Sequence, residues 1–144
     1  MINDAMLAVW APRMLSVLRI MTALLFLQHG LSKFFAWPGA APANFQAMSL
    51  IGLAGAIELV GGALLAVGLF TRIAAVIMSG EMAVAYFQSY APKAFFPVIN
   101  GGAPAALFCW IFFYLAFAGG GPWSLDALIV GASRPDDVDD RGSV

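Results

Sequence analysis

Four long apolar segments dominate this sequence and constrain what it can fold into. The first three are close to the ~20 residues that cross the hydrocarbon core of a bilayer, and the fourth is shorter. Their approximate bounds are 14–36, 50–70, 73–91 and 104–118. Hydrophobic residues make up 62% of the 144-residue chain and charged residues only 10%, less than half the share of charge in soluble domains. A soluble monomer of this size cannot bury so much apolar surface, so we predict an integral membrane protein.

The backbone of these segments determines their secondary structure. Polar backbone groups find no water in hydrocarbon, so each segment must pair them internally, as an α-helix does. The alternating pattern of membrane β-strands is absent. We therefore predict an all-α integral membrane four-helix bundle over residues 14–131, preceded by an N-terminal segment at 1–13. Trp123 is typical of membrane interfaces and Ser124 is a good helix N-cap, which together predict a short interfacial helix after the fourth span.

The distribution of basic residues predicts the orientation of the bundle. Four spans place both termini on one side of the membrane. That side carries most of the basic residues, namely Arg13, Arg72, Arg134 and Arg141. The opposite side, with loops at about 37–49 and 92–104, carries only Lys33 and Lys93. The positive-inside rule predicts cytoplasmic termini in a bacterial-type inner (cytoplasmic) membrane, with an acidic, disordered tail at 132–144.

Composition excludes several kinds of function. Cys109 is the only cysteine and His29 the only histidine, so we expect no disulfide and no protein-bound metal, haem or iron–sulfur centre. No flavin motif is present, and the net charge of −1 gives no reason to expect nucleic acid as a partner. Any electrons would have to come from a partner protein or from a substrate.

Ionisable residues inside the spans carry most of the information. Each costs about 2.5–3.5 kcal/mol on insertion scales, so each needs a reason. His29 and Lys33 share one face of the first helix, whereas Glu58 and Glu81 lie among small residues on the second and third. At a rise of about 1.5 Å per residue, the histidine and both carboxyl groups lie about 10–14 Å below the outer end. Trp110 of the fourth helix lies at a similar depth, so we predict one chamber in the outer half of the membrane.

Two arginines form a separate set near the inner end. Arg19 lies on the same face of the first helix as His29, and Arg72 follows the second helix. We predict that both are structural charges that steady the inner end of the bundle.

The predicted chamber suits the head group of a non-covalently bound quinone, which needs hydrogen-bond partners, a proton route and apolar walls. We predict that His29 and Glu58 contact the head group and that Glu81 relays protons, so these are the candidate catalytic residues. Lys33 is a further candidate ligand-binding residue, and Trp110 is a candidate wall. The same groups could instead be structural, with the carboxyl groups tying helices together and Lys33 anchoring its helix at the interface.

Several sequence blocks are similar to those of a known family. Arg19 is followed by FLQHGLSKFF (26–35), and the second helix contains GAIELVGGALLAVGLFTR (55–72). Later blocks are EMAVAYF (81–87), PVINGG (97–102) and GGGPWSLD (119–126). Together they resemble the DoxX family of small four-helix membrane proteins. The resemblance implies a four-helix bundle and a link to quinones, since the family is named after subunits of an archaeal thiosulfate:quinone oxidoreductase. Other members belong to oxidative-stress and quinone-detoxification systems, often as membrane partners of soluble enzymes.

One departure from the family pattern bears on the site. Similar members often carry an acidic residue directly after the NGG motif, whereas here Ala103 and Pro104 follow Gly102. If that acid takes part in the site, Glu58 and Glu81 are the carboxyl groups that remain.

Three functions stay open on the sequence alone. The leading hypothesis is a membrane subunit that binds a quinone or similar small lipid head group and serves an oxidoreductase system; if it is an enzyme, it is a quinone-linked component that needs a partner for electrons. The second is a structural or assembly subunit of a larger membrane complex, in which glycine faces such as Gly52, Gly55 and Gly62 seat a partner helix or a second copy. The third is a small proton-coupled carrier.

Overall fold

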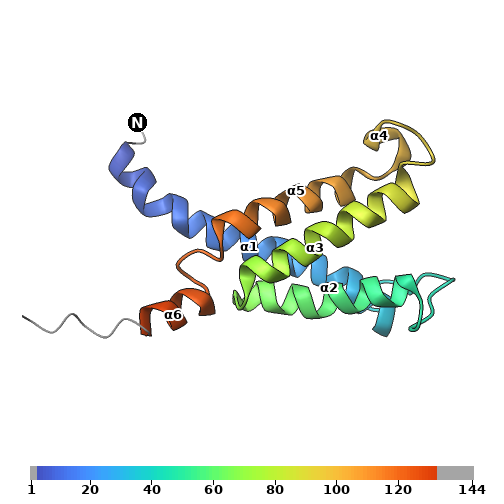
Figure 1. Cartoon of the computed structure of the whole chain (residues 1–144), viewed down its shortest axis with the longest axis horizontal. Helices are drawn as coiled ribbons and strands as arrows, with labels where there is room; N and C mark the ends of the chain where they lie inside the picture. Colours follow the sequence, from blue (N-terminus) through green and yellow to red (C-terminus); the bar gives the residue numbers. More distant parts are fainter. Residues whose placement is uncertain (1–2, 133–144) are drawn as a thin grey trace, which may run out of the picture.

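The computed structural model of the chain describes residues 3–132, and this part is all-α, as predicted (Figure 1). Its α-helices and one π-helix, in chain order, are α1 (Asp4–Phe35), α2 (Leu50–Val67), α3 (Thr71–Ala85), the π-helix η1 (Tyr86–Tyr90), α4 (Pro97–Asn100), α5 (Ala103–Ala118) and α6 (Leu125–Ala132). The apolar segments at 50–70, 73–91 and 104–118 are helical to within three residues of those bounds. Apart from Ala132, the predicted disordered tail lies outside the described residues.

The first helix begins ten residues before the first predicted span. The side chain of Asn3 caps it, with Oδ1 accepting a hydrogen bond from the backbone N–H of Met6 at 2.9 Å. Pro12 lies inside the helix, although proline removes a backbone donor there. The prediction of an N-terminal segment at 1–13 followed the apolar pattern alone and did not include the asparagine cap.

The helices pack as two pairs. α1 lies along α2 and α3 lies along α5, while α2 contacts α3 less extensively and α1 contacts α5 only slightly. Figure 1 shows the pairs diverging toward the end that carries the α1–α2 loop and α4. Small residues permit the close contacts. A Cβ atom at Gly61 would lie 2.6 Å from the sulfur of Met78, so a larger residue there would require the Met78 side chain to move.

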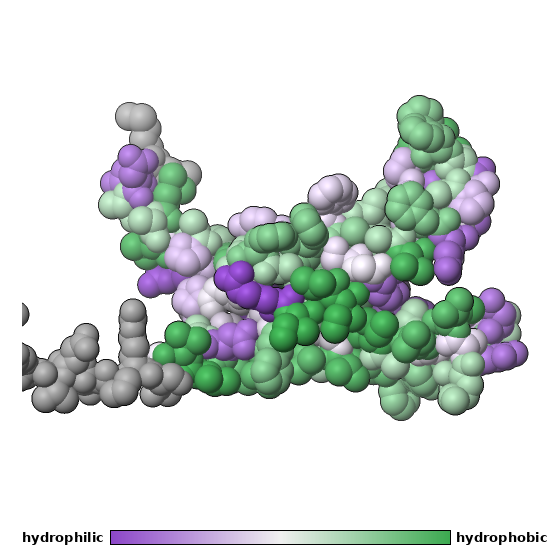
Figure 2. All heavy atoms as spheres, viewed as in Figure 1, coloured by the Kyte–Doolittle hydropathy of each residue, from purple (hydrophilic) through white to green (hydrophobic). Residues whose placement is uncertain are grey.

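The interior is small and the exposed surface is apolar. Phe26, Leu65, Met78 and Phe112 are completely buried at the centre of the molecule. By contrast, Figure 2 shows apolar side chains over much of the visible face of α2, α3 and α5. By length and composition α1 and α2 qualify as membrane-crossing helices, and α5 is a shorter apolar helix. Such an outer surface suits contact with lipid rather than with water.

Candidate functional site

A cavity of about 490 Å³ lies between the two helix pairs. α1, α2, α3, η1 and α5 all contribute to its walls. Its polar lining consists of His29, Lys33, Glu58, Glu81, Gln88, Ser89 and Tyr90. Apolar side chains such as Phe26, Ile57, Met82 and Phe108 complete it. A mostly apolar pocket with a few convergent polar groups is the usual form of a small-molecule site.

An ion pair joins α1 to α2 at this cavity. The ammonium group of Lys33 donates a hydrogen bond to Oε1 of Glu58 at 2.6 Å. The two side chains are only 18% and 4% exposed, so water screens the pair little. Gly55 lies one turn before Glu58, and a Cβ atom there would lie 3.2 Å from Cδ of Lys33. The glycine therefore leaves room for the lysine stem to turn inward instead of reaching the interface.

Two carboxylate oxygens at the cavity have no hydrogen-bond partner among residues 3–132. They are Oε2 of Glu58 and Oε2 of Glu81, and both atoms are buried. An unpaired buried acceptor costs about 1–3 kcal/mol, so such atoms in a folded protein call for an explanation. A hydrogen bond from a ligand, or a bound proton, could satisfy them. Because both residues line the cavity, a ligand bound there can reach them.

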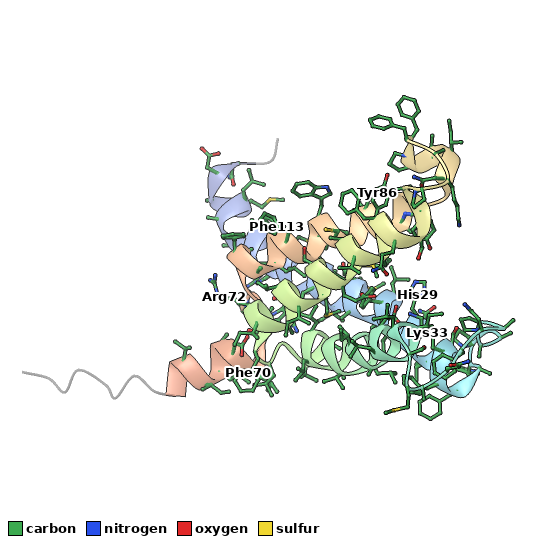
Figure 3. All side chains as sticks on the ribbon, turned by 45° about the vertical axis from the view of Figure 1, so that its right-hand side comes forward. His29, Lys33, Phe70, Arg72, Tyr86 and Phe113 are labelled. Carbon is green, nitrogen blue, oxygen red and sulfur yellow. The ribbon has the colours of Figure 1, made fainter. Side chains whose placement is uncertain are left out.

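The single histidine lies beside the aromatic part of the cavity. His29 contacts Phe26 and Phe108, each with a ring-centroid distance of 6.2 Å. Phe26 in turn packs edge-on against Phe112 at 4.8 Å. Figure 3 shows His29 and Lys33 near the end of α1 that enters the loop to α2. The sequence-predicted residues His29, Lys33, Glu58 and Glu81 thus line one cavity.

Trp110 is not part of this site. Its side chain is 70% exposed, and it contacts Phe113 on the outside of α5 at a ring-centroid distance of 5.9 Å. Phe108 lines the cavity, and a residue two positions further lies on the opposite side of an α-helix, which has about 3.6 residues per turn. The prediction that Trp110 forms a wall of the chamber was wrong. The depth of a residue in the membrane does not determine which way its side chain faces, and α5 is apolar on nearly all sides, so its sequence does not show which face points inward.

Residues of η1 line the cavity although the sequence analysis did not propose them as ligand contacts. Gln88, Ser89 and Tyr90 line it, as does Pro104 of α5. Gln88 was recognisable, because it is spaced to lie on the same helix face as Glu81. No sequence signal indicated the π-helical turn that carries it.

Charges at the opposite end bind backbone carbonyl groups. Arg19 is completely buried, and its Nη1 donates to the carbonyl oxygens of Leu65 at 2.5 Å and Ala66 at 3.0 Å, at the end of α2. Its other nitrogens donate to the carbonyl oxygens of Gly120 at 2.9 Å and Trp123 at 2.6 Å. A cation at a helix C-terminus also interacts favourably with the helix dipole. Arg19 therefore joins α1, the end of α2 and the segment before α6.

Arg72 has the corresponding role at the end of α5. Its Nη1 donates to the carbonyl oxygens of Phe117 at 2.7 Å and Ala116 at 3.2 Å. Because these are among the last carbonyl groups of α5, they have no partner within the helix. Figure 3 shows Arg72 at the same end of the molecule as Phe70.

Asp126 of α6 caps the beginning of α3. Its Oδ1 accepts the backbone N–H of Phe70 at 2.8 Å, and its Oδ2 accepts that of Thr71 at 2.9 Å. Burial acts to raise the pKa of Asp126, but the hydrogen bonds from Thr71 and Phe70 and the charge of Arg19 outweigh it, so the pKa is lowered. The predicted N-cap is present, since Oγ of Ser124 accepts the N–H of Ala127 at 3.1 Å.

Apolar helices long enough to cross a bilayer, with buried charges between them, are typical of integral membrane proteins. Comparison with known proteins narrows this class to one family. Residues 14–91 match the DoxX family, and the chain belongs to that family. A protein of Haemophilus influenzae that carries the name "Uncharacterized protein" is 42% identical over 122 residues, which are 81% of this chain and 91% of that protein. No solved structure matches the chain.

Proposed function

We propose that this DoxX-family membrane protein binds the head group of a quinone, or of a similar small lipid, in the cavity between its helix pairs and serves an oxidoreductase system. The observation that carries the proposal is the cavity itself, which combines apolar walls with Lys33, Glu58 and Glu81. A flat ring fits apolar walls, and its oxygens need the few polar groups that converge there.

The proposal includes a four-span arrangement in the membrane. α3 and η1 form one continuous helical stretch from Thr71 to Tyr90, about 30 Å long at 1.5 Å per residue, which matches the hydrocarbon core. α1, α2 and α5 are the other spans, and α6 lies at the interface. The positive-inside rule then puts Arg72 and both termini in the cytoplasm of a bacterial-type inner membrane, and the cavity in the outer half of the bilayer.

Each polar group has a defined task in this proposal. Lys33 and His29 donate hydrogen bonds to ring oxygens, and Glu81, which has no hydrogen-bond partner among residues 3–132, takes up or releases a proton. Glu58 holds Lys33 in place through the 2.6 Å ion pair. The quinone exchanges electrons when bound, and in this proposal a partner protein or a substrate supplies them.

Access from the lipid supports a lipid-soluble ligand. Leu53 and Val84 line the cavity and are also more than half exposed. The cavity therefore reaches the surface between α2 and α3, where the isoprenoid tail of a quinone could extend into the bilayer.

The test measures bound quinone directly. The protein is purified from its native membrane in mild detergent without stripping lipid, and extracted quinone is quantified per protein by mass spectrometry. We expect near-stoichiometric quinone in the wild type and several-fold less in Glu58→Gln. Trp110→Phe is the matched control, because this exposed side chain lies outside the cavity lining. Quinone no higher than lipid background in the wild type overturns the proposal and favours a structural subunit.

A further inference from the structure

The residues of η1 that line the cavity form what we call its polar edge. They are three consecutive residues, Gln88, Ser89 and Tyr90. Single π-helical turns within α-helices are rare and occur frequently at functional sites. Glu81 lies seven residues before Gln88 on the same helical stretch, about 10 Å away along the helix axis.

The side chains of this edge are available to a ligand. Among the described residues, neither the amide of Gln88 nor the hydroxyl of Ser89 has a hydrogen-bond partner, in contrast to Lys33, which is bonded to Glu58. Tyr90 is engaged through its ring, over which the ammonium group of Lys93 lies at 5.2 Å, and this leaves its hydroxyl free of partners in residues 3–132. The edge therefore offers several hydrogen-bond donors side by side.

Asn100 holds η1 from the outside of the cavity. The side chain is buried, and its Nδ2 donates to the hydroxyl of Tyr86 at 3.3 Å and to the carbonyl of Ala94 at 2.9 Å. Its Oδ1 accepts the N–H of Gly102 at 2.7 Å. A Cβ atom at Gly102 would lie 2.7 Å from both Tyr86 and Tyr90, so the turn packs directly on the two ends of η1.

We propose that η1 forms a second polar subsite, in which Gln88 and Ser89 donate hydrogen bonds to acceptor substituents on the ring of the head group, and that Asn100 is its positioning residue. This inference rests on the proposed function and narrows its substrate class to rings with oxygen substituents, such as alkoxy groups. A fused hydrocarbon ring at the same place would desolvate these donors without pairing them, which makes it the weaker ligand.

The experiment compares two probes on the full-length protein in detergent. One is a short-chain 2,3-dimethoxy-1,4-benzoquinone and the other a 1,4-naphthoquinone with the same chain. We expect the wild type to bind the dimethoxy probe roughly tenfold more tightly, as one or two neutral hydrogen bonds provide. The Gln88→Ala, Ser89→Ala double variant should lose this preference, because the dimethoxy probe loses its hydrogen bonds and the naphthoquinone no longer buries unpaired donors.

The positioning role of Asn100 is tested through the selectivity ratio, which is the affinity for the dimethoxy probe divided by the affinity for the naphthoquinone. Asn100→Ala should lower the ratio in the wild-type background and should not lower it further when Gln88 and Ser89 are already alanine, because it acts through them. Tyr86→Phe removes only one partner of Asn100 and keeps the ring, so it should lower the ratio less and still fold. Val98→Ala on α4 is the control, since this side chain is 85% exposed and outside the lining.

The outcomes separate the two proposals. Equal affinity for both probes in the wild type, or a preference that survives the loss of Gln88 and Ser89, overturns the subsite and leaves the quinone site standing. An Asn100→Ala effect that remains in the background without those two side chains overturns the positioning role. If neither probe binds saturably, the proposed function fails and the subsite fails with it.

Discussion

The two ends of this molecule use buried charge in different ways. At the end that holds Arg19 and Arg72, the guanidinium groups bind the carbonyl groups of helix ends, and Asp126 accepts the first N–H groups of α3. At the cavity, Lys33 and Glu58 bind each other, and Oε2 of Glu58 and Oε2 of Glu81 have no partner in the described part of the chain.

The difference separates structural charge from functional charge. A charge whose hydrogen-bonding capacity is used up by the backbone contributes to stability and offers nothing to a ligand. A charge with unused capacity costs stability, and such a cost is expected where a ligand completes the site. Substitutions at the two ends should therefore divide into those that change folding and those that change binding. The predictions below run from the largest to the smallest expected effect on stability.

The largest loss of stability is expected for Arg19→Met. Charge-assisted hydrogen bonds contribute about 1.5–3 kcal/mol each and are not additive, so losing the bonds of Arg19 should lower the free energy of unfolding by about 3–5 kcal/mol. Chemical unfolding in detergent measures this. Arg13→Met is the matched control, because Arg13 only lies over the ring of Trp10 at 5.3 Å. Similar losses in the two variants would contradict the role of Arg19 in joining α1, the end of α2 and the segment before α6.

The next largest effect is expected at the ion pair of the cavity. Glu58→Gln leaves the ammonium group of Lys33 largely buried without its carboxylate, which should cost about 2–4 kcal/mol of stability. Lys33→Met should restore part of that loss in the double variant, since it removes the unpaired charge. A double-mutant cycle on the unfolding free energies measures the coupling, and a coupling near zero would show that the pair does not stabilise the fold. Quinone content should be low in both variants, which separates binding from folding.

Asp126 should give a smaller, pH-dependent effect. Its folded-state pKa is lowered, so its contribution to stability is complete above the unfolded-state pKa of about 4 and is lost as the pH falls through the folded-state value. Asp126→Asn should cost about 0.5–1 kcal/mol at pH 7, at the low end for helix caps because the residue is partly exposed. Unfolding temperatures of the two proteins, measured from pH 7 to pH 3, should converge at the acidic end. A constant difference across this range would contradict the capping role.

Much of this arrangement could be predicted from the sequence because the membrane imposes simple rules. Apolar length and the obligatory pairing of backbone groups indicate helices at 50–70, 73–91 and 104–118. The cost of intramembrane charge indicates that Glu58 and Glu81 face inward, and the cavity confirms it.

The features that could not be predicted depend on how each helix is rotated about its own axis and on local backbone geometry. α5 is apolar on all sides, so nothing in its sequence indicated that Phe108 faces the cavity and Trp110 faces outward. The π-helical turn of η1 has no compositional signal, and the hold of Asn100 on Tyr86 depends on a contact across a loop. The acceptors of Arg19 are main-chain carbonyl groups, which sequence patterns do not distinguish.

The smallest change in stability, with a large change in binding, is expected for Glu81→Gln. No hydrogen bond to Glu81 is lost, because none of the described residues donates one, so the free energy of unfolding should change by less than about 1 kcal/mol. Quinone affinity should fall roughly tenfold, since a glutamine at this position can neither take up nor release a proton.

Ser79→Ala on the same helix is the matched control, because it should change stability and leave binding unchanged, the opposite of Glu81→Gln. The hydroxyl of Ser79 donates to the carbonyl of Cys109 at 2.9 Å, joining α3 to α5, and Ser79 does not line the cavity. Its loss should cost about 1 kcal/mol of stability and leave binding unchanged. If Glu81→Gln instead destabilises the protein as much as Ser79→Ala does and leaves quinone affinity intact, Glu81 is a structural charge. The two ends of the molecule would then use buried charge in the same way.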